Sequence, residues 1–93
     1  MAEQSSSLER LIGSEVVLDT AGPTIYLGTL REIRPDGLWL EDADIRDRTE
    51  GHVTKERYIC EAKEHGIHPN RRRIFVRIEV VLSGSALADV VID

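Results

Sequence analysis

Aromatic residues and cysteine are scarce in this chain of 93 residues, which holds one Trp, one Phe, two Tyr and one Cys. The single cysteine, Cys60, excludes an internal disulfide. Residues 1–7 are polar and lack the apolar core of a signal peptide, so we expect them to form a flexible leader. Because no apolar run is long enough to span a bilayer, we expect a small cytoplasmic domain with no membrane partner.

Positively charged residues are also fewer than negatively charged ones: the chain has 12 Lys and Arg and 17 Asp and Glu, which gives a net charge of −5. This balance argues against tight, non-specific adhesion to phosphate backbones or anionic membranes. The positive charge is concentrated, since the segment from Arg46 to Arg73 holds eight basic and five acidic residues. The sequence therefore predicts an acidic body that carries a mildly basic insertion.

The motifs of catalysis are absent as well. The sequence contains no nucleophile elbow and no phosphate-cradling glycine loop, and its acidic run from Glu41 to Asp44 is typical of a solvated strand end. Cys60, His65 and His68 offer three potential metal ligands in no recognised spacing, whereas a structural zinc site needs four. We expect no enzymatic activity, no cofactor and no metal site, with Cys60 acting as a small buried hydrophobe.

Aliphatic residues, in contrast, are abundant near the C-terminus. Between Arg73 and Ser83 they alternate with a period of two, which predicts a strand with one buried face. That face would consist of Ile74, Val76, Ile78, Val80 and Leu82. Phe75 and Val81 lie on the other face, and a second run, Leu87 to Ile92, is almost continuously apolar. Because a small domain rarely buries two such strands alone, this pair, hinged at Gly84, predicts a subunit partner.

The same type of pattern predicts three earlier strands, over residues 16–20, 24–34 and 38–45. Gly28 interrupts the second of them, which favours a bulge or a close backbone approach at a barrel corner. A tight turn at Pro35-Asp36-Gly37 joins the second strand to the third, and we expect Gly37 to take a positive φ there.

Two helices are predicted in addition. A short one over residues 7–12 would lie on the sheet as a lid. The second, over residues 55–65, has Thr54 as its N-cap and Gly66 just past its end. It lies within residues 46–70, which lack apolar alternation, and we interpret this segment as an insertion between the third and fourth strands.

Short motifs within these strands resemble those of the Sm-like (LSm) family. The first Sm motif is similar to Val16-Val17-Leu18, Tyr26-Leu27-Gly28-Thr29-Leu30 and Leu40-Glu41-Asp42-Ala43, and the second is similar to the stretch from Val80 to Leu87. The resemblance implies a mainly β fold. It would be a single domain over residues 1–93, a small SH3-like five-stranded barrel with an N-terminal helix and an inserted helix.

The resemblance also implies a homo-oligomeric ring. In that family strand four of one subunit pairs with strand five of the next, which agrees with the two-sided apolarity of the C-terminal stretch. The residues implied to form this interface are Phe75, Arg77, Val81, Leu87, Val90, Val91 and Ile92.

The family binds single-stranded RNA around the pore of the ring, with loops that correspond to residues 34–37 and 83–85 of this chain. The implied contact residues are Arg34, Asp36, Gly37, Ser83 and Gly84. The sequence departs from the family pattern, because the expected Asp and Asn fall on Ile33 and Gly37, and the expected Arg falls on Ser83. This departure argues against uridine-specific binding in the pore.

Arg71, Arg72 and Arg73 form the densest positive cluster, which a ring would repeat as a basic belt able to hold a phosphate chain. In the alternative, these arginines pair with Asp42, Asp44 or the glutamates of the inserted helix on a solvated surface. Two functions follow: a ring-forming scaffold that binds single-stranded RNA through the cluster, or an assembly module that binds no nucleic acid.

Trp39 alternates with two leucines, so we expect it to point away from the main core. Its indole would then pack under the inserted helix, pack against a neighbouring subunit, or stack on a ligand.

Overall fold

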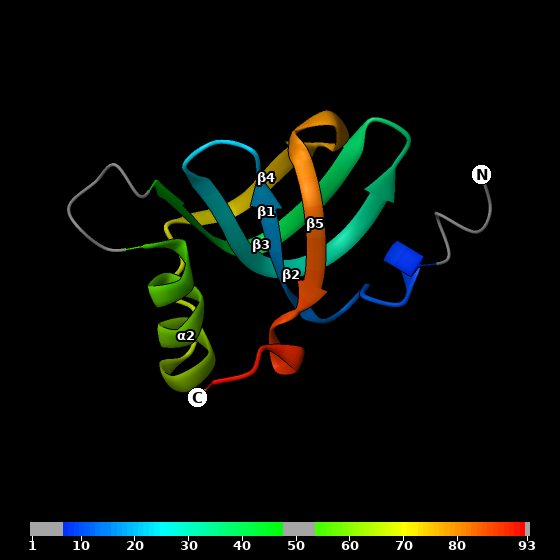
Figure 1. Ribbon diagram of the computed structural model, residues 1–93. Coiled ribbons are helices and arrows are strands. Elements are labelled where there is room, and N and C mark those ends of the chain that lie inside the picture. The colour runs from blue at the N-terminus through cyan, green and yellow to red at the C-terminus, as the bar shows by residue number, and fades with distance from the viewer. Residues whose placement is uncertain (1–6, 48–53, 93) are drawn as a thin grey trace.

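The structure is a computed structural model and describes residues 7–47 and 54–92. Within these residues, one antiparallel sheet holds five strands in the order β4-β3-β2-β1-β5, so β4 and β5 are its two edges. In chain order the elements are β1 (Glu15–Thr20), β2 (Thr24–Arg34), β3 (Gly37–Asp47), α2 (Lys55–His65), β4 (Arg71–Arg77), the 3-10 helix η1 (Ile78–Val80), β5 (Val81–Ala86) and the 3-10 helix η2 (Leu87–Asp89) (Figure 1). This order confirms the predicted mainly β fold with a helix between the third and fourth strands. None of the helices in the described part of the chain has the length and apolarity needed to cross a membrane.

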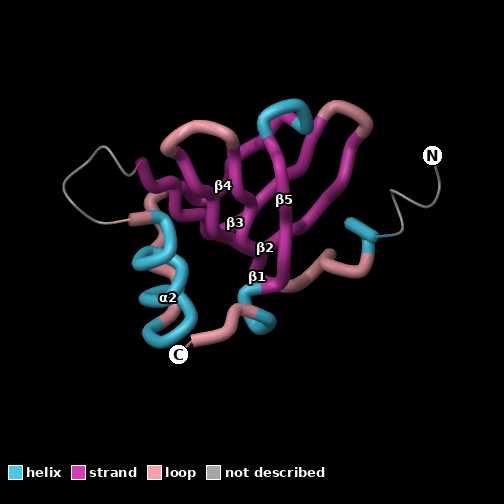
Figure 2. The backbone as a smooth tube through the Cα atoms, in the orientation of Figure 1, coloured by secondary structure: helices cyan, strands magenta, loops and turns pink. Residues whose placement is uncertain are grey.

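The sheet curls into a barrel, because its two longest strands, β2 and β3, are bent. Their pairing shifts register between Leu27 and Thr29, where a Cβ on Gly28 would lie only 3.1 Å from the Cα of Ala43. This is the close approach predicted for Gly28. Figure 2 shows the curled sheet with α2 to one side of it. The interior is filled by Val16, Leu18, Leu30, Leu38, Leu40, Ala43 and Val76, each at most 2% exposed.

The N-terminal segment packs against this interior. Residues 7–9 are helical and residues 10–13 form a turn, so the helix is shorter than the predicted 7–12. Leu8 and Leu11 pack against the core as a lid would, whereas Ile12 is exposed. The turn ends at Gly13, which has a φ of +89° and whose N–H donates to the Leu30 carbonyl at 2.7 Å. The predicted leader, apart from residue 7, lies outside the described residues.

Helix α2 begins and ends where the sequence predicted. The Oγ1 of Thr54 accepts a hydrogen bond from the N–H of Arg57, which satisfies one of the free donors of the first turn. Gly66 ends the helix with a φ of +89°, and its N–H donates to the Ala62 carbonyl at 2.8 Å. These local signals set where the helix begins and where it ends.

The inserted helix builds a second core on the opposite face of β1 and β2. Its buried residues, Ile59 and Ala62, pack with Val17, Ile25, Leu27 and Leu87. The Nζ of Lys55 donates to the Asp19 carboxylate at 2.7 Å and to the Thr20 carbonyl at 2.9 Å. At the other end of the helix, the Nζ of Lys63 donates to the Ala88 carbonyl. The insertion is therefore an integral layer of the fold.

The C-terminal stretch differs from the prediction of two strands, over residues 73–83 and 87–92, hinged at Gly84. The alternating run breaks at η1, because β4 must pair with β3 and β5 with β1, at opposite edges of the sheet. Of the predicted buried face, Val76 is buried and Ile74 half-buried, and Ile78, Val80 and Leu82 are exposed. The predicted last strand over residues 87–92 is also wrong, because its first three residues form η2 and those that follow lie outside the sheet.

Gly37 is needed for a different reason from the one predicted. Among the described glycines only Gly13 and Gly66 have a positive φ, so the expected dihedral at Gly37 is wrong. Instead, a Cβ on Gly37 would lie 2.3 Å from the carbonyl oxygen of Val76 and 2.6 Å from the Cζ of Phe75. The edge strand β4 and the ring of Phe75 can approach β3 here only because the side chain is absent.

We predict that Gly37→Ala lowers the free energy of unfolding by about 1–3 kcal/mol or more, because the added methyl group meets backbone as well as a ring. The measurement is urea unfolding at a fixed protein concentration, which also holds constant any contribution from association. Gly22→Ala is the matched control: nothing lies within 4 Å of its added Cβ. Its stability should change by no more than about 0.5 kcal/mol. Equal midpoints for the two variants would contradict the close approach.

Candidate nucleic-acid interface

Two connections of the chain meet at one end of the barrel, and we call them, with the residues that flank them, the loop pair: the β2–β3 turn from Arg34 to Gly37, and η1 with the preceding Arg77. The carbonyl of Asp36 accepts a hydrogen bond from the N–H of Ile78 at 2.9 Å. Gly37 and Arg77 face each other across β3 and β4 at the base of these connections. The predicted contact residues Arg34, Asp36 and Gly37 thus lie together, and the structure adds Arg77 to them.

The arginines of the loop pair are neutralised by neighbouring carboxylates. The Nε and Nη2 of Arg77 donate to the two carboxylate oxygens of Glu79 at 3.1 and 2.8 Å. This guanidinium holds the pKa of Glu79 below its ordinary value. Likewise, the Nη1 of Arg34 lies 3.2 Å from the Oε2 of Glu32. Because all four side chains are exposed, these pairs are weak, and a polyanion can compete with the carboxylates.

The other two predicted contact residues, Ser83 and Gly84, lie elsewhere. They are in the middle of β5, opposite Asp19 and Leu18 of β1. The turn predicted at residues 83–85 is therefore wrong, because η1 makes the connection from β4 to β5. Gly84 has a packing role instead, since a Cβ there would lie 3.1 Å from the Cδ2 of Leu18.

The arginine cluster, Arg71 to Arg73, begins β4 and is exposed. Successive residues of a strand point to opposite faces, so Arg71 and Arg73 share one face and Arg72 lies on the other. Within the described residues, no carboxylate forms an ion pair with any of the three, in contrast to the predicted alternative. Arg71 donates to the Asn70 carbonyl at 2.9 Å, and the guanidinium of Arg73 lies 4.9 Å from the centroid of the Trp39 ring.

Trp39 points away from the main core, as predicted. It lies directly across from Phe75 in the β3–β4 pairing, with ring centroids 5.1 Å apart and a tilt of 55° between the rings. The indole therefore packs against side chains of β4, and this resolves the alternatives left open by the sequence only in part. Both rings are half-buried, so each keeps a face or an edge in water.

The predicted interface residues fall into two groups. Phe75, Arg77 and Val81 lie on the two edge strands, and Val91 and Ile92 are exposed near the C-terminus. In contrast, Leu87 is only 4% exposed and packs in the second core together with Val90. Leu87 and Val90 therefore pack in the core of their own subunit. For the other five residues, a position in the subunit interface stays a prediction.

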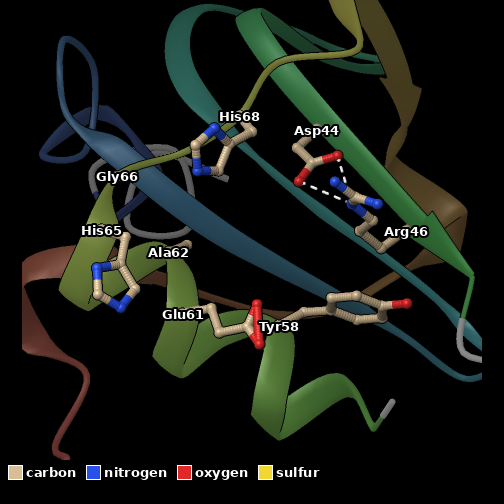
Figure 3. A pocket seen from close by; sticks show the side chains of 8 residues that line it. All are labelled: Asp44, Arg46, Tyr58, Glu61, Ala62, His65, Gly66 and His68. Atoms are coloured by element: carbon tan, nitrogen blue, oxygen red, sulfur yellow. Dashed lines mark hydrogen bonds and ion pairs between the residues drawn. The ribbon is translucent and has the colours of Figure 1, made fainter. Parts of the chain in front are cut away.

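A hollow of about 230 Å³ lies between β3 and the C-terminal half of α2. Figure 3 shows its lining, with Asp44 and Arg46 joined by an ion pair of 2.8 Å. Asp44 also accepts a hydrogen bond from the side chain of Asn70 at 3.1 Å, and the guanidinium of Arg46 lies 5.5 Å from the centroid of the Tyr58 ring. The charged groups of Asp44 and Arg46 are thus occupied within the protein, which indicates a structural role for this pair.

Residues His65 and His68 line the same hollow, whereas Cys60, half-buried on α2, is not part of its lining. Among the described residues, no group of three or more His, Cys, Asp or Glu side chains is placed to hold a metal ion. The hollow therefore gives no support to a metal site built from these three residues.

Solved structures supply the comparison that decides the fold. No protein-family model and no curated protein matches the sequence. An Sm protein of Pyrococcus abyssii in complex with a uridine heptamer superposes with a TM-score of 0.61 at 15% identity, over 88% of this chain and 94% of that one. An SmAP1 heptamer of P. aerophilum gives 0.58 at 22% identity over 92% and 95%, and a heptameric archaeal Sm protein gives 0.54 at 22% over 87% and 96%. The chain has the Sm fold.

The Sm fold changes the interpretation of the second motif. The sequence-based alignment put the expected arginine at Ser83, but in the structure the turn between strands four and five follows Arg77 directly. Arg77 is thus the last residue of β4 before this connection. In the sequence, the only local signal for a turn after Arg77 is an apolar residue followed by arginine. This signal is too short to be preferred over Gly84, which favours a turn at residues 83–85.

We predict that Arg77→Ala raises the pKa of Glu79 toward the ordinary value for glutamate, because the hydrogen bonds that favour the ionised form are lost. The measurement is the carboxyl carbon chemical shift of Glu79 as a function of pH. Arg34→Ala is the control, since it removes another exposed arginine of the loop pair, one that pairs with a different carboxylate, that of Glu32. An unchanged titration of Glu79 in Arg77→Ala would show that the pair does not exist in solution.

Proposed function

We propose that this protein is a ring-forming scaffold of the Sm type that binds single-stranded RNA through its arginine cluster, Arg71 to Arg73. The observation that carries the proposal is the combination of two open sheet edges with a cluster of arginines, beside one of them, that no described carboxylate neutralises.

Ring formation is supported by the two ends of the sheet. In the order β4-β3-β2-β1-β5, the outer edges of β4 and β5 have no partner among the described strands, and a neighbouring subunit would close both. The aliphatic side chains of Ile78, Val80 and Leu82 are exposed at and just after the connection between these strands. Two of the similar structures are described as heptamers, which supports a cyclic homo-oligomer here.

RNA binding is supported by the positive charge of the arginine cluster and by the similarity of the fold to a solved protein–RNA complex. The cluster places three cations on consecutive residues, and none is tied to a described carboxylate, so they remain available to phosphates. A ring would repeat the cluster once per subunit and let a single strand contact several copies. One of the similar structures holds a uridine heptamer.

The second candidate is an assembly module that binds no nucleic acid. It is favoured by the net charge of −5 and by the neutralisation of Arg34 and Arg77 in the loop pair. The two candidates share the ring and differ only in what the exposed arginines contact.

We predict that Leu82→Arg lowers the oligomeric state without unfolding the subunit, because Leu82 is 68% exposed in the subunit and lies on the edge strand β5. Light scattering behind a sizing column should give a multiple of 10.5 kDa for the natural protein and a smaller mass for the variant. Ile12→Arg is the control, since Ile12 is an exposed aliphatic residue outside the sheet. A natural protein that is a monodisperse monomer at tens of micromolar would rule out the ring.

We predict salt-sensitive binding of short labelled U-rich, A-rich and mixed RNAs, measured by fluorescence anisotropy, because phosphate contacts release counterions. Removing one arginine of the cluster, as in Arg72→Ala, should reduce the dependence of log K on log salt by about one phosphate contact. Glu61→Gln on α2 removes a charge from a distant exposed pair and should leave that slope unchanged. Absence of salt-sensitive binding at micromolar protein would favour the assembly module.

A further inference from the structure

The outer face of β3 and β4 carries aromatic and cationic side chains in alternation. The pairing sets Trp39 opposite Phe75 and Glu41 opposite Arg73, so Phe75 and Arg73 share the face of Trp39, and the alternation of side chains along β4 puts Arg71 on that face too. The intervening residues, such as Leu38 and Val76, are buried on the other face. We call the four residues Trp39, Arg71, Arg73 and Phe75 the ledge.

Stacking contacts already order the ledge. The guanidinium of Arg73 lies over the Trp39 ring at 4.9 Å, and the Phe75 ring is 5.1 Å from it. Such a guanidinium presents a second planar face, and nucleic-acid bases stack on both Arg planes and aromatic rings. The flat groups are thus held in place before any ligand binds, which reduces the entropy lost on binding.

The ledge is continuous with the loop pair. The Cζ of Phe75 would lie 2.6 Å from a Cβ on Gly37, so the ring covers the position where β3 leaves the β2–β3 turn. Arg77 follows on the same face of β4, opposite Gly37. Successive same-face residues of a strand are spaced at about 6.7 Å, so β4 presents Arg, Arg, Phe and Arg in one row.

The charges of the ledge favour a polyanion. The carboxylate opposite Arg73, that of Glu41, already pairs with another arginine, because the Nε of Arg31 donates to it at 2.8 Å. Within the described residues Arg71 and Arg73 have no ion pair, so each can bind a phosphate at little cost. An acidic peptide would use these cations but would have no planar groups to match the rings.

We propose that the ledge binds the bases of a single-stranded nucleic acid by stacking on Trp39, Phe75 and the Arg73 guanidinium, while Arg71 contacts the backbone. This inference rests on the proposed function and adds a base-stacking surface to its charge-based binding. Stacking requires bases that are free of their neighbours, so the ledge selects single strands over duplexes without reading sequence.

The single tryptophan of the chain makes the test specific, because its fluorescence reports on the ledge alone. Full-length protein is titrated with a short oligouridylate and a short oligoadenylate, and quenching of Trp39 is compared with the anisotropy of the labelled strand. We expect quenching that follows the binding curve for both strands and no quenching by a duplex RNA of the same length.

Two matched substitutions separate stacking from charge. Arg73→Lys and Arg57→Lys both keep the charge, but only the first removes a planar group from the ledge, since Arg57 is an exposed residue of α2. We expect Arg73→Lys to weaken single-strand binding by about fivefold or more, the effect of one lost stacking contact, and Arg57→Lys to leave it unchanged. Phe75→Leu, which keeps an apolar side chain, should also weaken binding, and far-UV circular dichroism verifies that each variant folds.

The outcomes distinguish the ledge from the function on which it rests. Binding in the anisotropy assay without quenching, or equal affinities of the two lysine variants, would overturn the ledge and leave RNA binding intact. A lack of binding to any single strand would overturn both. Equal quenching by polyglutamate would show that the face takes acidic chains, which would also overturn base stacking.

Discussion

Burial of β1 on both faces is the constraint on which the other elements depend. Val16 and Leu18 point into the barrel and Val17 points away from it, yet all three are at most 6% exposed. A curled sheet covers only its concave side, so the convex side of β1 needs a separate layer. Helix α2 and η2 supply that layer, and the lysines at the two ends of α2 fasten it to β1 and η2. The insertion is thus a structural requirement of this barrel.

The strand order β4-β3-β2-β1-β5 leaves β4 at an edge of the sheet, and this position gives β4 several contacts at once. Its inner face adds Val76 to the core, and its outer face carries Arg71, Arg73 and Phe75. Its free edge is directed away from β3. Side chains above and below an edge strand remain accessible when the edge itself is paired, so subunit assembly and ligand contact do not exclude each other on this strand.

Local charge matters more than the total here. The net charge of −5 describes the whole surface, but exposed charges separated by more than about 8 Å are largely screened at physiological ionic strength. A single-stranded nucleic acid that approaches β4 is influenced mainly by the charges of Arg71 to Arg73, which no described carboxylate neutralises. In the loop pair the situation is reversed, because Glu79 and Glu32 occupy the guanidinium groups of Arg77 and Arg34.

The sequence by itself determined the elements that have local signals: strand β2, the caps of α2 at Thr54 and Gly66, and the close approach at Gly28. It also put Trp39 outside the main core. Only the tertiary structure decided where the stretch after Arg73 turns, because its aliphatic alternation continues through η1 with no glycine or proline to mark the break. The turn falls there because β4 pairs with β3 and β5 pairs with β1, which makes them the two opposite edges of the sheet. Contacts between residues far apart in the chain therefore placed Arg77, and not Ser83, beside the β2–β3 turn.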